Sequence, residues 1–182
     1  MGIDALRRRA VFLDRDGVLN RSIIRDGKPF PPDTVDQLEI LPGVEDACSD
    51  LRAAGFALVV VTNQPDVARG TQTRALVEQM NQLLVDRLHL DAVMVCYHDD
   101  QDDCLCRKPK PGLLSEAAGQ LEIDLAKSFM IGDRWKDIEA GRRAGCTTIF
   151  VDSGHIEVRT DTGDCEVSSL RAGADWILSQ KK

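Results

Sequence analysis

The chain has 182 residues, of which 43% are hydrophobic and 29% charged, and its formal net charge is −7 at pH 7. This length is suited to one well-packed domain, and we expect that domain to span residues 1–182. The acidic balance argues against a nucleic-acid partner, and no apolar run approaches the ~20 residues that span a bilayer, so we expect no membrane partner either.

Short β-branched apolar runs alternate with segments of helical period along the whole chain. The predicted strands are Ala10–Asp14, Ala57–Thr62, Ala92–Tyr97, Ser128–Ile131 and Thr147–Val151. The predicted helices are Gly43–Ala54, Thr73–Leu88, Pro111–Leu121, Trp135–Ala144 and Ser168–Ser179. This alternation predicts an α/β fold with a doubly wound, Rossmann-like parallel sheet and helices on both of its faces.

Two segments follow neither period. The stretch Arg21–Pro32 is polar and proline-rich, and we expect a loop or flap beside the end of the first strand. The stretch His98–Pro111 is acidic, then rich in cysteine, then basic. The chain shows no internal repeat and no linker long enough to divide it.

Two carboxylates, Asp14 and Asp16, follow the first predicted strand and precede Gly17. The carboxyl ends of parallel strands are where open α/β sheets bind ligands. Two acids placed there can hold a divalent cation, or can share the roles of nucleophile and proton donor. The same pattern also describes an ordinary Asp-rich turn, so it needs support from elsewhere in the chain.

Further polar residues suited to phosphate chemistry occur near later strand ends. They are Thr62-Asn63-Gln64, Arg107-Lys108, and the pair Asp133 and Asp137. Taken singly, these residues also fit a capped turn, surface charge and a helix N-terminal acid pair. In a doubly wound sheet, however, the strand ends converge on one crevice, and the residues together predict one site there.

A block of sulfur and imidazole ligands lies between the third strand and the third helix. Cys96, His98, Cys104 and Cys106 make up a tetrahedral Cys₃His zinc set within eleven positions. The spacing is tighter than that of a nucleic-acid-binding finger, and all four positions are filled, so we expect a structural zinc that positions Arg107 and Lys108. The alternative is a chance group of thiols in an acidic loop.

Three other cysteines, Cys48, Cys146 and Cys165, are scattered along the chain. They are most simply small buried residues or free thiols rather than disulfides. The arginines near the N-terminus are not followed by an apolar stretch of signal-peptide length. We therefore expect a cytoplasmic protein.

Across nearly its full length the chain resembles the haloacid dehalogenase (HAD) superfamily of phosphotransferases. Asp14-Arg-Asp16-Gly-Val matches the first motif of that superfamily, Thr62 the second, Lys108 the third, and Gly132-Asp133 with Asp137 the fourth. The resemblance implies that Asp14 is the nucleophile and Asp16 the general acid and base, for which a raised pKa would be suited. Thr62 and Lys108 would bind the phosphoryl group. Mg²⁺ would be held by Asp14, the backbone carbonyl of Asp16 and Asp133, with Asp137 in support.

The cysteine block makes the chain similar to the capless, zinc-containing subgroup, which includes D-glycero-D-manno-heptose 1,7-bisphosphate 7-phosphatases and histidinol-phosphate phosphatases. Ala68-Arg-Gly70 and Pro111-Gly112 are closer to the heptose branch. The resemblance implies a monomeric phosphatase without a cap domain, acting on a small phosphorylated metabolite. A heptose bisphosphate is the first expectation, and histidinol phosphate or another small metabolite is the alternative. The implied substrate-binding residues are Asn63, Gln64, Arg69, Arg107 and Arg134.

The chain departs from the heptose pattern at three places that we expect to face the substrate. Tyr97 stands where proline is usual, Pro65-Asp66-Val67 replaces Ser-Gly-Ile, and Asp26–Phe30 replaces a Gly-Tyr element. The chemistry is therefore better predicted than the substrate. A zinc-stabilised binding protein with a vestigial site is a further alternative, but the intact motif residues argue against it. A DNA-end phosphatase is disfavoured by the acidity of the chain.

Overall fold

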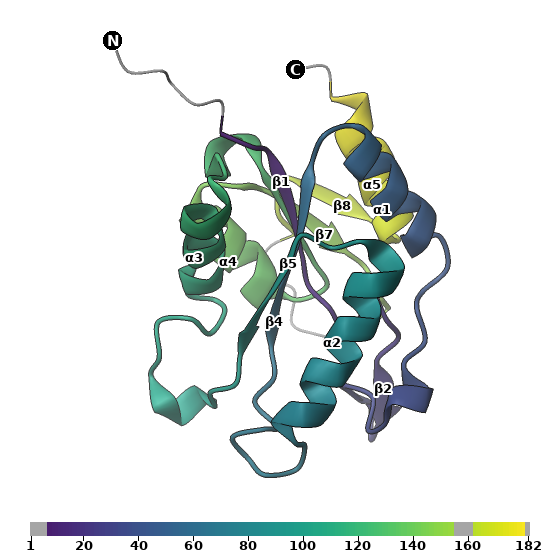
Figure 1. The fold of residues 1–182 in the computed structure, drawn as a ribbon, viewed down its shortest axis with the longest axis vertical. Helices are drawn as coiled ribbons and strands as arrows, with labels where there is room; N and C mark the ends of the chain where they lie inside the picture. Colours follow the sequence, from purple (N-terminus) through teal and green to yellow (C-terminus); the bar gives the residue numbers. More distant parts are fainter. Residues whose placement is uncertain (1–6, 155–161, 181–182) are drawn as a thin grey trace.

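A six-stranded parallel sheet forms the centre of the computed structural model, which describes residues 7–154 and 162–180 (Figure 1). The strand order is β5-β4-β1-β6-β7-β8, with every neighbouring pair parallel. The strands are β1 (Ala10–Leu13), β4 (Ala57–Asn63), β5 (Ala92–Cys96), β6 (Phe129–Gly132), β7 (Thr147–Val151) and β8 (Cys165–Val167).

Five α-helices cover the two faces of this sheet. They are α1 (Val44–Ala53), α2 (Arg74–Leu88), α3 (Gly112–Leu121), α4 (Trp135–Ala144) and α5 (Leu170–Ser179). Helices α3 and α4 lie on one side of the sheet, whereas α1, α2 and α5 lie on the other (Figure 1). This confirms the predicted doubly wound α/β arrangement, and the predicted helix ends agree with the structure to within two residues.

The side chains of each strand point alternately to the two faces of the sheet, and this alternation produces two separate hydrophobic cores. Along β1, Val11 and Leu13 are buried with residues of α1, α2 and α5, while Ala10 and Phe12 are buried with residues of α3 and α4. Because successive side chains of a strand point to opposite faces, a strand that is covered on both faces must be apolar throughout. All four residues of β1 are 0% exposed, and this strand therefore holds the residues that follow it in a fixed place.

Local signals explain where the helices begin. The hydroxyl of Thr73 accepts a hydrogen bond from the N–H of Leu76 at the start of α2, and Ser169 does the same for Ala172 at the start of α5. Helix α1 begins after Gly43, whose φ of 76° is in the left-handed region.

Two features were not predicted from the sequence. The flap contains an antiparallel hairpin of β2 (Ile23–Arg25) and β3 (Lys28–Phe30), and β8 adds a sixth strand at the sheet edge. Short 3₁₀ helices occur at Val35–Gln37, Asp100–Asp102 and Leu125–Lys127.

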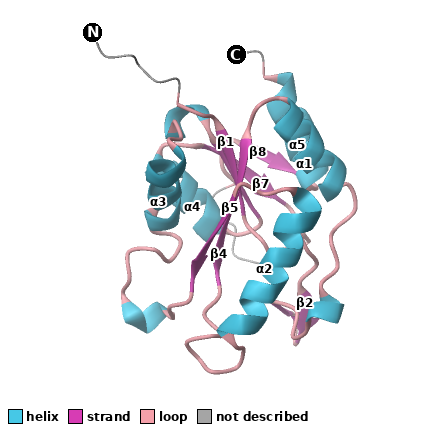
Figure 2. Cartoon of the chain, viewed as in Figure 1, coloured by secondary structure: helices cyan, strands magenta, loops and turns pink. Residues whose placement is uncertain are grey.

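Figure 2 shows β2 beyond the carboxyl end of the sheet, near the loop that follows β4. No helix among the described residues is long and apolar enough to cross a membrane.

Candidate active site

A pocket of about 290 Å³ lies at the carboxyl end of the sheet, where β1, β4 and β6 end. It contains the residues predicted for catalysis and substrate binding, together with Asp137, which was predicted to support the metal: Asp14, Asp16, Thr62, Asn63, Gln64, Arg69, Arg107, Lys108, Arg134 and Asp137. Three strand ends and the loop that carries Arg107 and Lys108, all far apart in sequence, therefore meet at one place, as the topology requires. The volume is suited to a small metabolite.

Lys108 lies between two carboxylates at the floor of this pocket. Its Nζ is 2.8 Å from Oδ1 of Asp14 and 2.6 Å from Oδ1 of Asp137, and it also donates to the carbonyl oxygen of Val61 at 2.7 Å. The lysine is 2% exposed. Its charge is thus desolvated and directed at the two acids, which is the arrangement that lets one ammonium group neutralise a bound phosphoryl group.

Asp133 completes a group of three carboxylates with Asp14 and Asp137. One oxygen from each lies within 4.8 Å of those from the other two. Oδ1 of Asp133 is buried and has no hydrogen-bond partner within residues 7–154 and 162–180, while Oδ2 accepts from the hydroxyl of Ser153 at 3.2 Å. Three carboxylates face one ammonium here, so the group has an excess of negative charge. Such a set, with an orphaned oxygen, fits a hard divalent cation such as Mg²⁺.

Two glycines allow these carboxylates to approach so closely. Gly17 has φ of +91°, and a Cβ on it would lie 2.1 Å from Oδ2 of Asp133. A Cβ on Gly132 would lie 2.1 Å from Cβ of Asp137. Any larger residue at either position would displace a carboxylate, so both glycines are part of the site.

The crowding of like charges changes the proton affinity of the group. Burial, aided by the charge of Asp137 and opposed by Lys108, raises the pKa of Asp14 to about 6. Burial and the charges of Asp14 and Asp137 raise the pKa of Asp133 well above its usual value. Burial acts to lower the pKa of Lys108, but the negative charges of Asp137 and Asp14 have the larger effect, and the pKa is raised above its usual value. Lys108 is therefore charged at neutral pH, and a divalent cation would relieve the repulsion.

Asp16 faces a different environment. Its carboxylate accepts hydrogen bonds from Arg15, from Nδ2 of Asn20 at 2.9 Å and from Nε2 of Gln64 at 2.8 Å. Burial acts to raise the pKa of Asp16, but Arg15 and the two amides outweigh it and hold the pKa below its usual value. From the sequence we expected a raised pKa to suit Asp16, whereas the structure gives a lowered one. The expectation missed this because the sequence does not show that the Arg15 side chain turns onto Asp16.

The amides that follow β4 are engaged with the protein itself. Asn63 donates to the carbonyl oxygen of Lys108 at 3.1 Å and accepts from its N–H at 3.1 Å. Gln64 donates to Thr62 at 2.9 Å as well as to Asp16. Asn63 therefore holds the backbone that carries Lys108, and Gln64 holds Asp16, in addition to lining the pocket.

The rim of the pocket is rich in cations, and acids of the loop between Cys96 and Cys104 neutralise them. Arg69 forms two hydrogen bonds with Asp99, and Arg107 donates to Asp100 at 2.8 Å. Lys136, in the first turn of α4, also approaches Asp100 and lines the pocket, although it was not predicted as a site residue. Only its place two residues after Arg134 could have indicated it.

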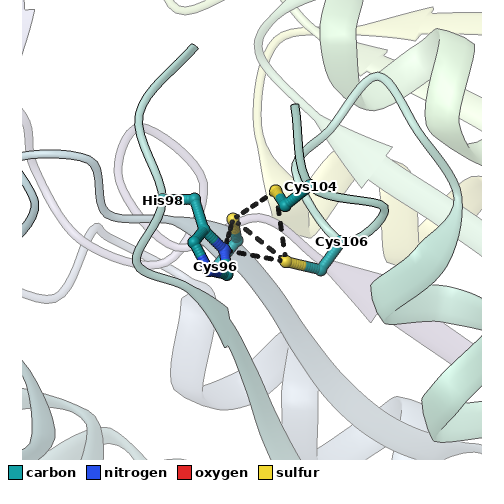
Figure 3. Close-up of side chains that lie close together, drawn as sticks. All are labelled: Cys96, His98, Cys104 and Cys106. Carbon is teal, nitrogen blue, oxygen red and sulfur yellow. Dashed lines mark hydrogen bonds between the residues drawn. The ribbon is translucent and has the colours of Figure 1, made fainter. Parts of the chain in front are cut away.

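The four predicted zinc ligands converge at one point (Figure 3), and Asp100 and Arg107 of the same loop line the pocket. Five of the distances between their ligand atoms, all three sulfur pairs included, are 3.3–3.7 Å. A tetrahedron with Zn–S bonds of about 2.3 Å has sulfur–sulfur edges of about 3.8 Å, so this donor set fits zinc. Burial raises the pKa of the Cys104 thiol, but hydrogen bonds, first from the backbone of Arg107, outweigh it and lower the pKa to about 7.

The scattered cysteines have no such arrangement. Cys48 and Cys146 are buried, and burial raises the pKa of each thiol to about 12. Among the described residues all six cysteines are free. The prediction that these thiols behave as small apolar residues is confirmed for this pair.

The three departures from the heptose pattern are placed differently. Pro65, Asp66 and the hairpin residues Pro29 and Phe30 line the pocket, as expected. Tyr97 does not, so the expectation that it faces the substrate was wrong. Its ring lies 4.7 Å from the guanidinium carbon of Arg74 and lines a separate hollow between α2 and β5. Position 97 comes directly after β5, between the predicted zinc ligands Cys96 and His98, and faces α2 rather than the pocket.

Comparisons with known proteins agree with this geometry. A family model for HAD-hydrolase-like proteins matches residues 105–177. The chain is 38% identical to the D-glycero-beta-D-manno-heptose-1,7-bisphosphate 7-phosphatase of Yersinia pestis, over 93% of this chain and 89% of that protein. It is also 38% identical to the enzyme of the same name from Escherichia coli K12, over 93% of this chain and 88% of that protein.

Solved structures are similar as well. A D,D-heptose 1,7-bisphosphate phosphatase from B. bronchiseptica, complexed with magnesium and phosphate, has a TM-score of 0.82 and 29% identity, covering 95% of this chain and 99% of that one. A HAD-like phosphatase from Mesorhizobium loti has a TM-score of 0.76 and 28% identity, covering 97% of this chain and 90% of that one.

Proposed function

The chain belongs to the HAD-like hydrolases, in the family of the D-glycero-beta-D-manno-heptose-1,7-bisphosphate 7-phosphatases, and we propose that it removes the 7-phosphate of D-glycero-D-manno-heptose 1,7-bisphosphate. As a member of this family it is a phosphoric monoester hydrolase. The observation that carries the proposal is the buried carboxylate of Asp14, which lies 2.8 Å from the Lys108 ammonium and beside Asp133 and Asp137.

In the proposed reaction, an oxygen of Asp14 attacks the phosphorus atom. The bond between phosphorus and the sugar oxygen breaks. Asp16, which must first be protonated although its hydrogen-bond donors favour the ionised form, gives its proton to that oxygen, which leaves as an alcohol. Water then attacks the phosphorus of the aspartyl phosphate while Asp16 takes a proton from it. Inorganic phosphate leaves and Asp14 is restored.

The residues around Asp14 account for the charges in this reaction. A carboxylate attacks a phosphate dianion only when nearby positive charge screens the repulsion, and the Lys108 ammonium supplies part of it. Thr62, near the end of the neighbouring strand β4, lines the same pocket and would donate to the phosphoryl oxygens. Mg²⁺ held by Asp14 and Asp133, with Asp137 in support and the carbonyl of Asp16 as a further proposed ligand, would neutralise the remaining charge.

Substrate selection would come from the rim of the pocket. Arg69, Arg107, Arg134 and Lys136 line it together with Phe30 of the hairpin. A bisphosphorylated sugar carries a second phosphate that such cations would recognise. We further propose zinc in the Cys₃His cluster, a monomer acting as one domain, and a cytoplasmic location, which is suited to reduced thiolate ligands.

The test is a panel of substrates at fixed Mg²⁺ concentration. We expect kcat/KM to be highest for the heptose 1,7-bisphosphate, compared with histidinol phosphate and hexose phosphates. Phosphorus NMR should show loss of the 7-phosphate resonance while the 1-phosphate remains. A clear preference for histidinol phosphate would replace the proposed substrate, and no hydrolysis of any phosphate would favour a non-catalytic binding protein.

A further inference from the structure

Arg15 is the largest fully buried side chain among the described residues. It is 0% exposed, although it stands between the two catalytic aspartates in sequence. A buried guanidinium costs several kcal/mol of desolvation unless it is well paired, and an apolar side chain of similar volume would fill the same space without that cost. The position therefore needs an explanation other than packing.

The hydrogen bonds of Arg15 run in two directions. Nη2 donates to both oxygens of Asp16, at 3.0 and 2.9 Å, and Nε donates to Oδ2 at 3.2 Å. Nη1 donates to Oδ1 of Asn81 at 3.1 Å. Asn81 belongs to α2, is 6% exposed, and does not line the pocket that holds Asp14. The guanidinium thus connects α2 to the carboxylate of Asp16.

The geometry of the guanidinium explains what this connection can do. Its donors are fixed in a planar fork, so holding one edge determines the direction of the others. Asn81 holds Nη1, and the opposite edge is then presented to Asp16. Asn20 and Gln64 add one donor each, so three side chains hold the carboxylate while its side chain remains 17% exposed toward the pocket.

We propose that Arg15 is a positioning residue for Asp16, and that Asn81 of α2 orients Arg15 for this task. The proposal rests on the function proposed above, in which Asp16 moves a proton to and from the reacting oxygens. Neither Arg15 nor Asn81 touches the substrate. Their effect is to hold Asp16 in the orientation for proton transfer, where a small displacement is costly.

The test compares Asn81→Leu with Asn81→Asp, which both keep a side chain branched at Cγ and differ in whether it offers an acceptor for Nη1 of Arg15. Two substrates are used: the heptose bisphosphate, whose alkoxide must be protonated as it leaves, and 4-nitrophenyl phosphate, whose weakly basic phenolate leaves without a proton. We expect Asn81→Leu to lower kcat/KM for the sugar about tenfold or more, with KM little changed, and to affect the nitrophenyl ester far less. Asn81→Asp should retain most of the activity.

Arg15→Met should show the same selective loss to a greater degree. If this variant fails to fold, the Asn81 pair alone decides. The control is Leu84→Ala, which removes a buried apolar side chain from the same helix, leaves the hydrogen bond between Asn81 and Arg15 in place, and should change both substrates in parallel.

Equal effects of Asn81→Leu and Asn81→Asp, or a parallel loss on both substrates, would overturn the proposal. The wild-type activities, measured alongside, report separately on the proposed function. A wild type that hydrolyses neither ester would overturn both.

Discussion

Nζ of Lys108 lies 2.8 Å from Oδ1 of Asp14, and the side chains of the pair are 3% and 10% exposed. The contact joins the end of β1 to a loop 94 residues further along the chain. The same ammonium reaches Asp137 at 2.6 Å. The loss of the Lys108 ammonium should therefore have two measurable effects, one on the stability of the metal-free protein and one on catalysis.

Replacing Lys108 with methionine should destabilise the metal-free protein by about 3–5 kcal/mol at neutral pH, because buried carboxylates lose their counter-ion. Phosphatase activity should fall with it. Urea unfolding of the metal-free protein measures the effect. Lys110→Met is the matched control, because Lys110 pairs with the exposed Asp103 and its loss should change stability little. Equal losses in the two variants would contradict the account of the buried group.

Mg²⁺ binding should weaken as the pH falls through about 6. The pKa of Asp14 is raised to about 6 in the folded protein from an ordinary 3.8, so the folded state binds a proton that the unfolded state has lost. The stabilising contribution of this bound proton is therefore present below about pH 4 and is lost as the pH rises through about 6. A cation must displace that proton, and calorimetry at pH 5 and pH 8 should show weaker binding at pH 5.

Asp14→Asn is the control for this titration. Without the ionisable group, the metal-free variant should gain stability relative to the wild type as the pH rises from 4 to 7. A stability difference between the two proteins that does not change with pH would show that Asp14 titrates normally.

Chelation of zinc should expose one unusually reactive thiol. The pKa of Cys104 is lowered to about 7, whereas burial raises those of Cys48 and Cys146 to about 12. Thiolates are the reactive species, so Cys104 should react first with a thiol reagent in the metal-free protein, and neither buried cysteine should react before unfolding. Peptide mapping after brief labelling identifies the site. Metal analysis should give one zinc per chain, and its absence would remove the proposed structural role.

The parts of the fold with a clear period could be predicted from the sequence. The apolar run of β1 and the helical period of α2 are long enough to identify, and the topology then brings Asp14 and Lys108 together. The strands β2, β3 and β8 have three residues each, too few for a period. The direction of the Tyr97 side chain was missed for a related reason. Successive side chains of a strand point to opposite faces of the sheet, so a shift of one residue in where β5 ends reverses the predicted direction.

The surroundings of Asp16 could not be predicted either. Arg15 and Asn81 are 66 residues apart, and no motif connects them. An arginine between two aspartates usually indicates a solvated side chain, since charged residues are rarely buried. Only the packing of α2 against the loop after β1 places Asn81 within reach of Arg15. The pKa of Asp16 is lowered by the charge of Arg15 and by hydrogen bonds from Asn20, Gln64 and Arg15, which outweigh burial.

The most direct test of the central claim is to look for the aspartyl phosphate itself. The enzyme is mixed with Mg²⁺ and the heptose bisphosphate, quenched in acid within one turnover, and examined by intact-protein and peptide mass spectrometry. We expect one added phosphoryl group on the peptide that contains Asp14. The Asp14→Asn variant should carry none and should lose activity by about 10³-fold or more. Rapid phosphate release with no phosphorylated protein, together with an active Asp14→Asn variant, would contradict the central claim.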